Sequence, residues 1–201
     1  MATYTPNSGT KHISGRTHIN IDYGYDALGN SACFNIKLDT IVIILESPHT
    51  DEYVYVNGIL APKGPLVGSW GNFEQYFHAA IQGSALNSYI SNTKVYNIAF
   101  VNAIQYQCSL GKTLYKNSVN TDRKNQNVIN SWYSGFSVDL EKRLMALNPI
   151  FLVDLSGKTQ EIHSAIINML KKSTLSSIPF TYGIHPSKWK QYSKLGNKLI
   201  Q

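Results

Sequence analysis

The sequence predicts an α/β fold, a three-layer α/β/α domain built on a central four-stranded parallel sheet. Four short apolar runs alternate with segments of helical periodicity, and this alternation is typical of parallel strands joined by right-handed crossover helices. The strands are expected near Ile41, Ile98, Leu152 and Thr181. Because the runs are rich in apolar residues, the strands are expected to be buried on both faces, with helices on both sides of the sheet.

No repeat or interdomain linker interrupts this order, so residues 1–201 are expected to form a single domain. Residues 1–38 are interpreted as an N-terminal hairpin or extension, because residues 17–23 and 33–38 alternate like strands. Residues 39–196 are the expected core. Its predicted elements are strands at 39–45, 95–104, 150–155 and 180–184, helices at 72–81, 127–147 and 159–172, and a loop at 57–71.

Composition limits the class of protein. Hydrophobic residues make up 43% of the chain and charged residues 15%, which predicts a folded globular protein, and no apolar run approaches the roughly 20 residues that span a bilayer. Cys33 and Cys108 cannot supply a four-thiolate metal or iron–sulfur site. With no signal-peptide pattern, we expect a cytoplasmic monomer without membrane contact, metal or cofactor. The net charge of +6 favours a polyanionic partner, which we expect to be DNA, single- or double-stranded.

A polar motif stands where each apolar run ends. In chain order, the four motifs are Glu46-Ser47-Pro48-His49, Asn102-Ala103, Asp154-Leu155-Ser156-Gly157 and His185-Pro186-Ser187. In open α/β sheets, ligands bind outside the carboxyl ends of the strands, which meet at one edge. The motifs are therefore expected to form one composite site. Residues 156–159 lack the earlier glycine of a phosphate-binding loop and are interpreted as a helix start.

At these positions the chain resembles the uracil-DNA glycosylase superfamily, over residues 39–196. The segment 45–49 is similar to the family's Gly-Glu-Ala-Pro-Gly or Gly-Gln-Asp-Pro-Tyr, and 63–71 resembles the Gly-x-Pro-Phe-Val-Gly-x-x-Gly of its iron–sulfur branch. Residues 100–104 resemble Leu-Leu-Asn-x-Val, and 150–157 resemble the strand that ends in Leu-Gly. His185-Pro186-Ser187 matches His-Pro-Ser, and the residues after it stand where the family has a DNA-wedging loop.

The resemblance implies a DNA glycosylase that flips a base out of the helix and hydrolyses the N-glycosidic bond of uracil or another deaminated base. Asn102 would bind the polar edge of the base, His185 would donate to the departing O2, and Glu46 would position or activate water. The other expected substrate contacts are Ser47, Pro48, His49, Leu66 and Phe73. The expected DNA contacts are Ser187, Lys188, Trp189 and Lys190.

Two departures from the family pattern leave alternatives open. Ser47 stands where the most active branch has its catalytic Asp, and Leu66 replaces the stacking Phe. One alternative is therefore a non-catalytic nucleic-acid-binding relative with the same fold, and a weaker one is a hydrolase of free nucleosides or nucleotides. Each motif also has a purely structural interpretation, for example Trp189 packing on the core.

Overall fold

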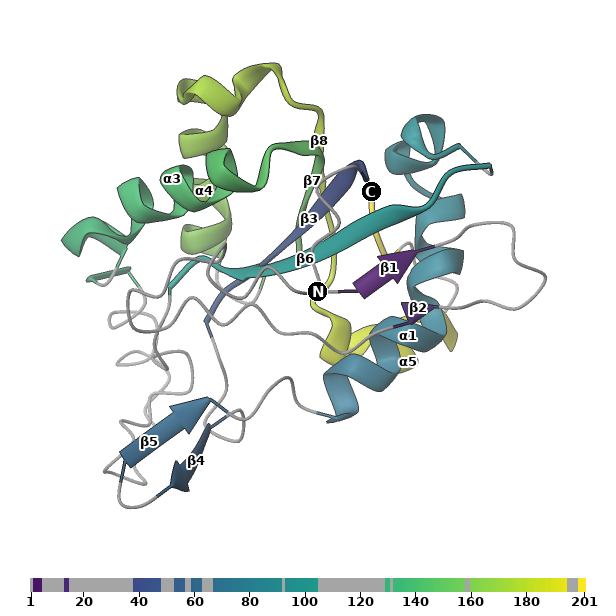
Figure 1. The fold of residues 1–201 in the computed structure, drawn as a ribbon, viewed down its shortest axis with the longest axis horizontal. Coiled ribbons are helices and arrows are strands. Elements are labelled where there is room, and N and C mark those ends of the chain that lie inside the picture. Colours follow the sequence, from purple (N-terminus) through teal and green to yellow (C-terminus); the bar gives the residue numbers. More distant parts are fainter. Residues whose placement is uncertain are drawn as a thin grey trace.

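In the computed structural model of the protein, the described residues are 2–4, 13–14, 38–47, 53–56, 59–62, 67–91, 93–104, 129–130, 132–157, 160–194 and 199–201. The main sheet has six strands in the order β2-β1-β6-β3-β7-β8 (Figure 1). Their bounds are β1 Ala2–Tyr4, β2 Ile13–Ser14, β3 Thr40–Leu45, β6 Tyr96–Asn102, β7 Pro149–Asp154 and β8 Phe180–Tyr182.

The predicted parallel sheet is confirmed. β3 pairs in parallel with β6 and with β7, and β7 pairs in parallel with β8. β1 and β2 extend this sheet as antiparallel strands at the β6 edge, which the sequence did not predict because strands of three and two residues are too short to show a period of two. The strand expected at 17–23 lies outside the described residues, and so does the strand expected at 33–38 except for residue 38.

Helices pack against both faces of the sheet. Alternate residues of β3 point to opposite faces, so Val42 and Ile44 belong to one apolar cluster and Ile41 and Ile43 to another. The first cluster includes side chains of α3 (Ser137–Leu147) and α4 (Gln160–Lys172). The second includes side chains of α1 (Val67–Gln82) and α5 (Trp189–Lys194). Figure 1 shows these two pairs of helices on opposite sides of the strands.

Several predicted bounds need correction. The expected loop at 57–71 contains β5 (Ile59–Pro62), which pairs with β4 (Tyr53–Val56), and the first turn of α1. The expected helix at 127–147 is not continuous, because Gly135 has a φ of 125° inside η4 (Trp132–Phe136) and breaks it before α3. Other short helical segments in the described ranges are η3 (Ala85–Tyr89), η5 (Thr174–Ser177) and η6 (Pro186–Lys188). No helix in the described ranges has the length and apolarity to span a bilayer.

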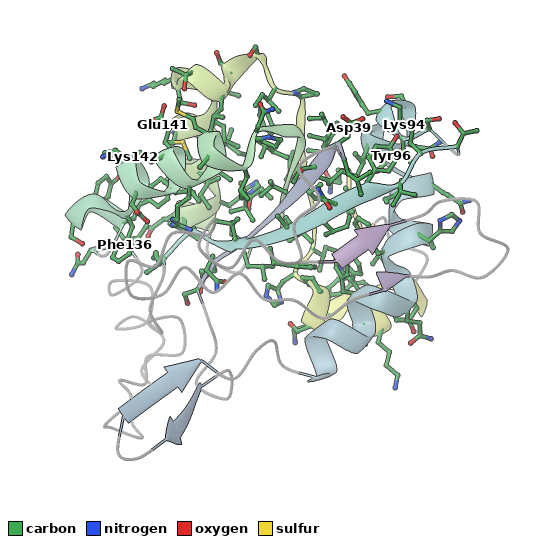
Figure 2. The ribbon with its side chains drawn as sticks, in the orientation of Figure 1. Asp39, Lys94, Tyr96, Phe136, Glu141 and Lys142 are labelled. Carbon is green, nitrogen blue, oxygen red and sulfur yellow. The ribbon has the colours of Figure 1, made fainter. Side chains whose placement is uncertain are left out.

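The order of the parallel strands creates a switch point between β3 and β7. From β3 the chain crosses to β6 on one side, and from β6 it returns past β3 to β7 on the other side. The first connection contains α1 and the second contains α3, which lie on opposite faces of the sheet. Such a reversal opens a crevice at the carboxyl ends of the two strands, and ligands of open α/β sheets bind there. The opposite edge carries an exposed ion pair, in which Lys94 Nζ lies 3.1 Å from Asp39 Oδ2 (Figure 2).

Candidate functional site at the carboxyl edge of the sheet

The strand register brings the expected polar residues to one edge. Leu45 pairs with Asn102, and Asp154 pairs with Ile44 on one side and with Tyr182 on the other. Glu46 directly follows β3, and His185 follows β8 by three residues. All four strands are parallel, so these residues lie at the same edge of the sheet.

The His-Pro-Ser turn fixes which nitrogen of His185 carries a hydrogen. Ser187 N–H donates to His185 Nδ1 at 3.2 Å, and Ser187 Oγ lies 2.8 Å from the same nitrogen. A backbone N–H only donates, so Nδ1 is an acceptor and the hydrogen of the neutral ring belongs on Nε2. The His185 ring is half-buried, and Ser187 holds it through Nδ1.

Two side chains hold this turn from either side of His185. Trp189 Nε1 donates to the carbonyl of Ile184, and Asn72 Nδ2 of α1 donates to the carbonyl of Pro186 at 3.2 Å. Asn72 was missed by sequence reasoning, because the contact joins residues 114 positions apart and nothing local signals it.

The structure corrects the expected roles of Trp189 and Phe73. Trp189 is 0% exposed and Phe73 is 1% exposed, so neither ring has surface for DNA or a base. The Phe73 ring stacks on Phe77 at 4.3 Å and on Trp189 at 5.5 Å, and it meets Phe100 edge-on. Burial of the large apolar surface of these rings between α1 and the sheet is more favourable than their exposure to water. Both are therefore core residues, and Trp189 contributes to the site through Ile184.

The other expected contacts differ in their surroundings. Ser187, Lys188 and Lys190 are exposed, so their polar groups are accessible beside the turn. Glu46 is 3% exposed, and its backbone carbonyl accepts from Ile104 N–H at 3.0 Å. The predicted contacts Pro48, His49 and Leu66 lie outside the described residues.

Arg143 fixes the backbone beside Asn102. This α3 residue is 8% exposed, and its Nη1 and Nη2 donate to the carbonyls of Asn102 at 2.8 Å and Ala103 at 3.2 Å. Its Nε donates to Asp139 Oδ2 at 2.7 Å, one helical turn earlier. The guanidinium therefore ties the end of β6 to α3. A basic residue within an amphipathic helix usually faces solvent, so no local pattern selects Arg143 as a site residue.

A buried carboxylate and an imidazole form a second polar group at this edge. Asp154, the last residue of β7, is 1% exposed, and its Oδ2 lies 2.7 Å from Nδ1 of His163 in the first turns of α4. Asp154 Oδ1 accepts from Ser156 N–H at 2.9 Å. The hydrogen bond to Asp154 raises the pKa of His163 above its usual 6.5, against the opposing effect of burial. No sequence motif selected His163, and an aspartate at the end of a buried strand is the signal that could have selected the pair.

Within the described residues, no group of three or more His, Cys, Asp or Glu side chains could hold a metal ion. Comparisons of the chain with models of protein families, with curated proteins and with solved structures gave no match. The functional assignment therefore depends on the chemistry of the residues at this edge.

Proposed function

We propose that this protein is a DNA glycosylase related to the uracil-DNA glycosylase superfamily, with the three-layer α/β/α arrangement of that fold. It would hydrolyse the N-glycosidic bond of uracil or another deaminated base in DNA. The observation that carries the proposal is the engagement of His185 Nδ1 by Ser187, which places the hydrogen of the neutral ring on Nε2, at the strand edge that also holds Asn102 and Glu46.

The proposed chemistry assigns one role to each group. Asn102 offers a donor and an acceptor to the polar edge of the base, and Arg143 keeps its backbone in place. When the bond between C1′ of the sugar and N1 of the base breaks, the electron pair leaves with the base, and His185 Nε2–H stabilises the charge at O2. Glu46 places a carboxylate beside the sugar cation and positions the attacking water.

DNA would bind beside the His-Pro-Ser turn. Lys188 and Lys190 are exposed next to that turn, and the net charge of +6 favours a polyanion. Each neutralised phosphate contributes about −0.9 to the slope of log affinity against log salt for duplex DNA. Replacing both lysines by alanine is expected to lower affinity for every DNA sequence and to flatten the slope by up to about 1.8.

The matched control changes Lys171 and Lys172 to alanine. These lysines are also exposed, but they end α4, and that end of the helix lies toward the amino edge of the sheet. Their replacement is expected to leave most of the salt slope intact. Equal flattening in both double variants would remove Lys188 and Lys190 from the proposed DNA contact.

The test of catalysis is single-turnover excision from single-stranded and duplex oligonucleotides containing uracil, hypoxanthine, xanthine or a mismatch. His185→Ala is expected to reduce the rate on the cleaved substrate by about a hundredfold to a thousandfold while DNA affinity stays close to that of the wild type. Binding without excision of any base would refute the glycosylase and favour the non-catalytic relative. That outcome is consistent with Ser47, which cannot act unaided as the base that the most active branch supplies at this position.

A further inference from the structure

The proposed reaction needs a group that takes a proton from water, and a buried aspartate–histidine pair lies at the same carboxyl edge of the sheet. Asp154 lies in register between the two strands that carry the proposed site: Leu155 N–H donates to the carbonyl of Ile44 at 2.8 Å, and Gly183 N–H donates to the carbonyl of Asp154 at 2.9 Å. Glu46 is two residues beyond Ile44, and His185 is two residues beyond Gly183. Asp154 therefore ends the strand that lies between the strands leading to Glu46 and to His185, and its partner His163 lies in the first turn of α4.

The hydrogen bonds of Asp154 determine the tautomer of His163. Asp154 Oδ1 is already occupied by Ser156 N–H, and Oδ2 faces His163 Nδ1 at 2.7 Å. A buried carboxylate accepts a hydrogen there, so Nδ1 carries the hydrogen and Nε2 of the neutral ring is a free acceptor within this hydrogen-bond scheme. The His163 side chain is 21% exposed, and the ring of Tyr182 meets it edge-on at 5.0 Å. A held ring with a basic nitrogen and partial access to solvent is suited to proton transfer.

Two buried hydroxyls flank the same switch point. Ser47 Oγ comes shortly after β3 and Ser156 Oγ comes shortly after β7, and neither has a hydrogen-bond partner among the residues that the structure describes. A buried hydroxyl without a partner is costly, and such groups commonly meet a water or a ligand. Polar atoms that can hold a water thus occur after both strands that frame the crevice.

We propose that His163 is the general base of the reaction, with Asp154 as its positioning residue; this inference rests on the proposed glycosylase function. Water attacks C1′ as the bond to the base breaks, the new bond forms between C1′ and the water oxygen, and His163 Nε2 takes the proton from that oxygen. The electron pair of the broken bond leaves with the base. The products are a deoxyribose bearing a hydroxyl at C1′ and the free base.

Two variants test the general base, His163, and its positioning residue, Asp154, separately. His163→Asn keeps an N–H donor for Asp154 but has no basic nitrogen, and it is expected to reduce the single-turnover rate by about a hundredfold to ten-thousandfold without loss of DNA affinity. In Asp154→Asn, Ser156 N–H holds the amide oxygen, so the amide nitrogen faces His163 Nδ1 and forces its hydrogen to Nε2. A carboxylate-to-amide change of this kind cost about ten-thousandfold in a serine protease, and a loss of similar order is expected here.

The pH profile gives a readout that a structural role would not move. In the wild type the rate should fall as pH drops through the pKa of His163, which lies above 6.5, and this acid limb should be absent in His163→Asn. His78→Asn is the matched control, because His78 is also half-buried but belongs to α1 on the other face of the sheet. Thermal unfolding of each variant verifies that it is folded.

The outcomes distinguish the inference from the function on which it rests. Excision by the wild type together with an unchanged rate and acid limb in His163→Asn overturns the role of His163 and leaves the glycosylase standing. A wild type that excises no base overturns the proposed function and the inference together. A slow His163→Asn variant that has lost the acid limb, beside a normal His78→Asn, supports both.

Discussion

Replacing Arg143 by methionine is expected to loosen the end of β6 and to destabilise the fold. Methionine keeps most of the unbranched aliphatic length, so the packing of the side chain against its neighbours is largely retained. The change removes the two hydrogen bonds to the carbonyls of Asn102 and Ala103, at 2.8 and 3.2 Å. Ala103 is 0% exposed, so water cannot readily replace the lost donor at that position.

The expected cost follows from these contacts. Hydrogen bonds to a charged group contribute about 1.5 to 3 kcal/mol each, and relief of the desolvated guanidinium offsets part of their loss. We therefore expect the free energy of unfolding to fall by about 2 to 4 kcal/mol in Arg143→Met. Urea unfolding followed by tryptophan fluorescence should show a midpoint lower by about 1 to 2 M. Under the proposed function, base discrimination should weaken as well, because Asn102 loses its backbone support.

The control is Asp139→Asn, which weakens only the outer partner of the same arginine. Asp139 is 43% exposed and pairs with Arg143 within one helix, so its charge contributes about 0.3 to 0.5 kcal/mol. Two results would refute the reasoning. One is an unfolding midpoint of Arg143→Met equal to that of the wild type. The other is an equal loss of stability in the two variants, which would mean that Arg143 stabilises the fold through its ion pair with Asp139 and not through the two carbonyls.

Three further predictions concern the support of the site. A Cβ on Gly183 would lie 2.2 Å from the backbone oxygen of Leu199, so Gly183→Ala should lower the free energy of unfolding by about 2 to 3 kcal/mol. A Cβ on Gly71 would meet nothing within 4 Å, so Gly71→Ala should stabilise α1 by up to about 1 kcal/mol. Equal unfolding midpoints for these two variants would contradict the prediction. Trp189→Phe leaves the Ile184 carbonyl without its donor and should lower the free energy of unfolding by about 1 to 3 kcal/mol in urea; under the proposed function it should also slow excision. Because the pKa of His163 is raised in the folded protein, the protonated ring stabilises the fold fully below about pH 6.5, and this stabilisation should disappear as pH rises through the raised pKa. His163→Asn should remove this pH dependence of stability from a series of thermal unfolding curves.

The parallel sheet could be predicted because its strands are buried on both faces. A strand such as Thr40–Leu45 must be apolar at successive positions, and this leaves a continuous signal that turns and helices do not share. The break at Gly135 left no such signal, since an isolated glycine is tolerated in many helices and its positive φ is a property of the folded chain. The edge strands β1 and β2 were missed because the pairing of β1 with β6 and of β2 with β1 depends on backbone contacts and not on side-chain pattern.

The candidate site was only partly predictable, for a related reason. Glu46, Asn102 and His185 were selected because each follows an apolar run, and strand ends can be located from local sequence. Trp189 has the sequence context of a wedging residue, with a lysine on either side, but a large ring gains more free energy from burial than from solvent exposure. Whether an aromatic residue beside a strand end turns inward or outward depends on space left by other elements, which local sequence does not encode.

The Asp154–His163 pair shows what such a topology permits. Parallel strands carry their polar ends to one edge at a fixed spacing, so groups from neighbouring strands become chemical neighbours although they are distant in sequence. An acidic or basic role at this edge is therefore not tied to one motif. Under the proposed function, the serine at position 47 would remove a carboxylate from the end of β3, and the carboxylate and imidazole at the end of β7 would supply the proton acceptor from the adjacent strand. Catalysis would then depend on His163 and tolerate Ser47, which is the reverse of what the first motif alone predicts.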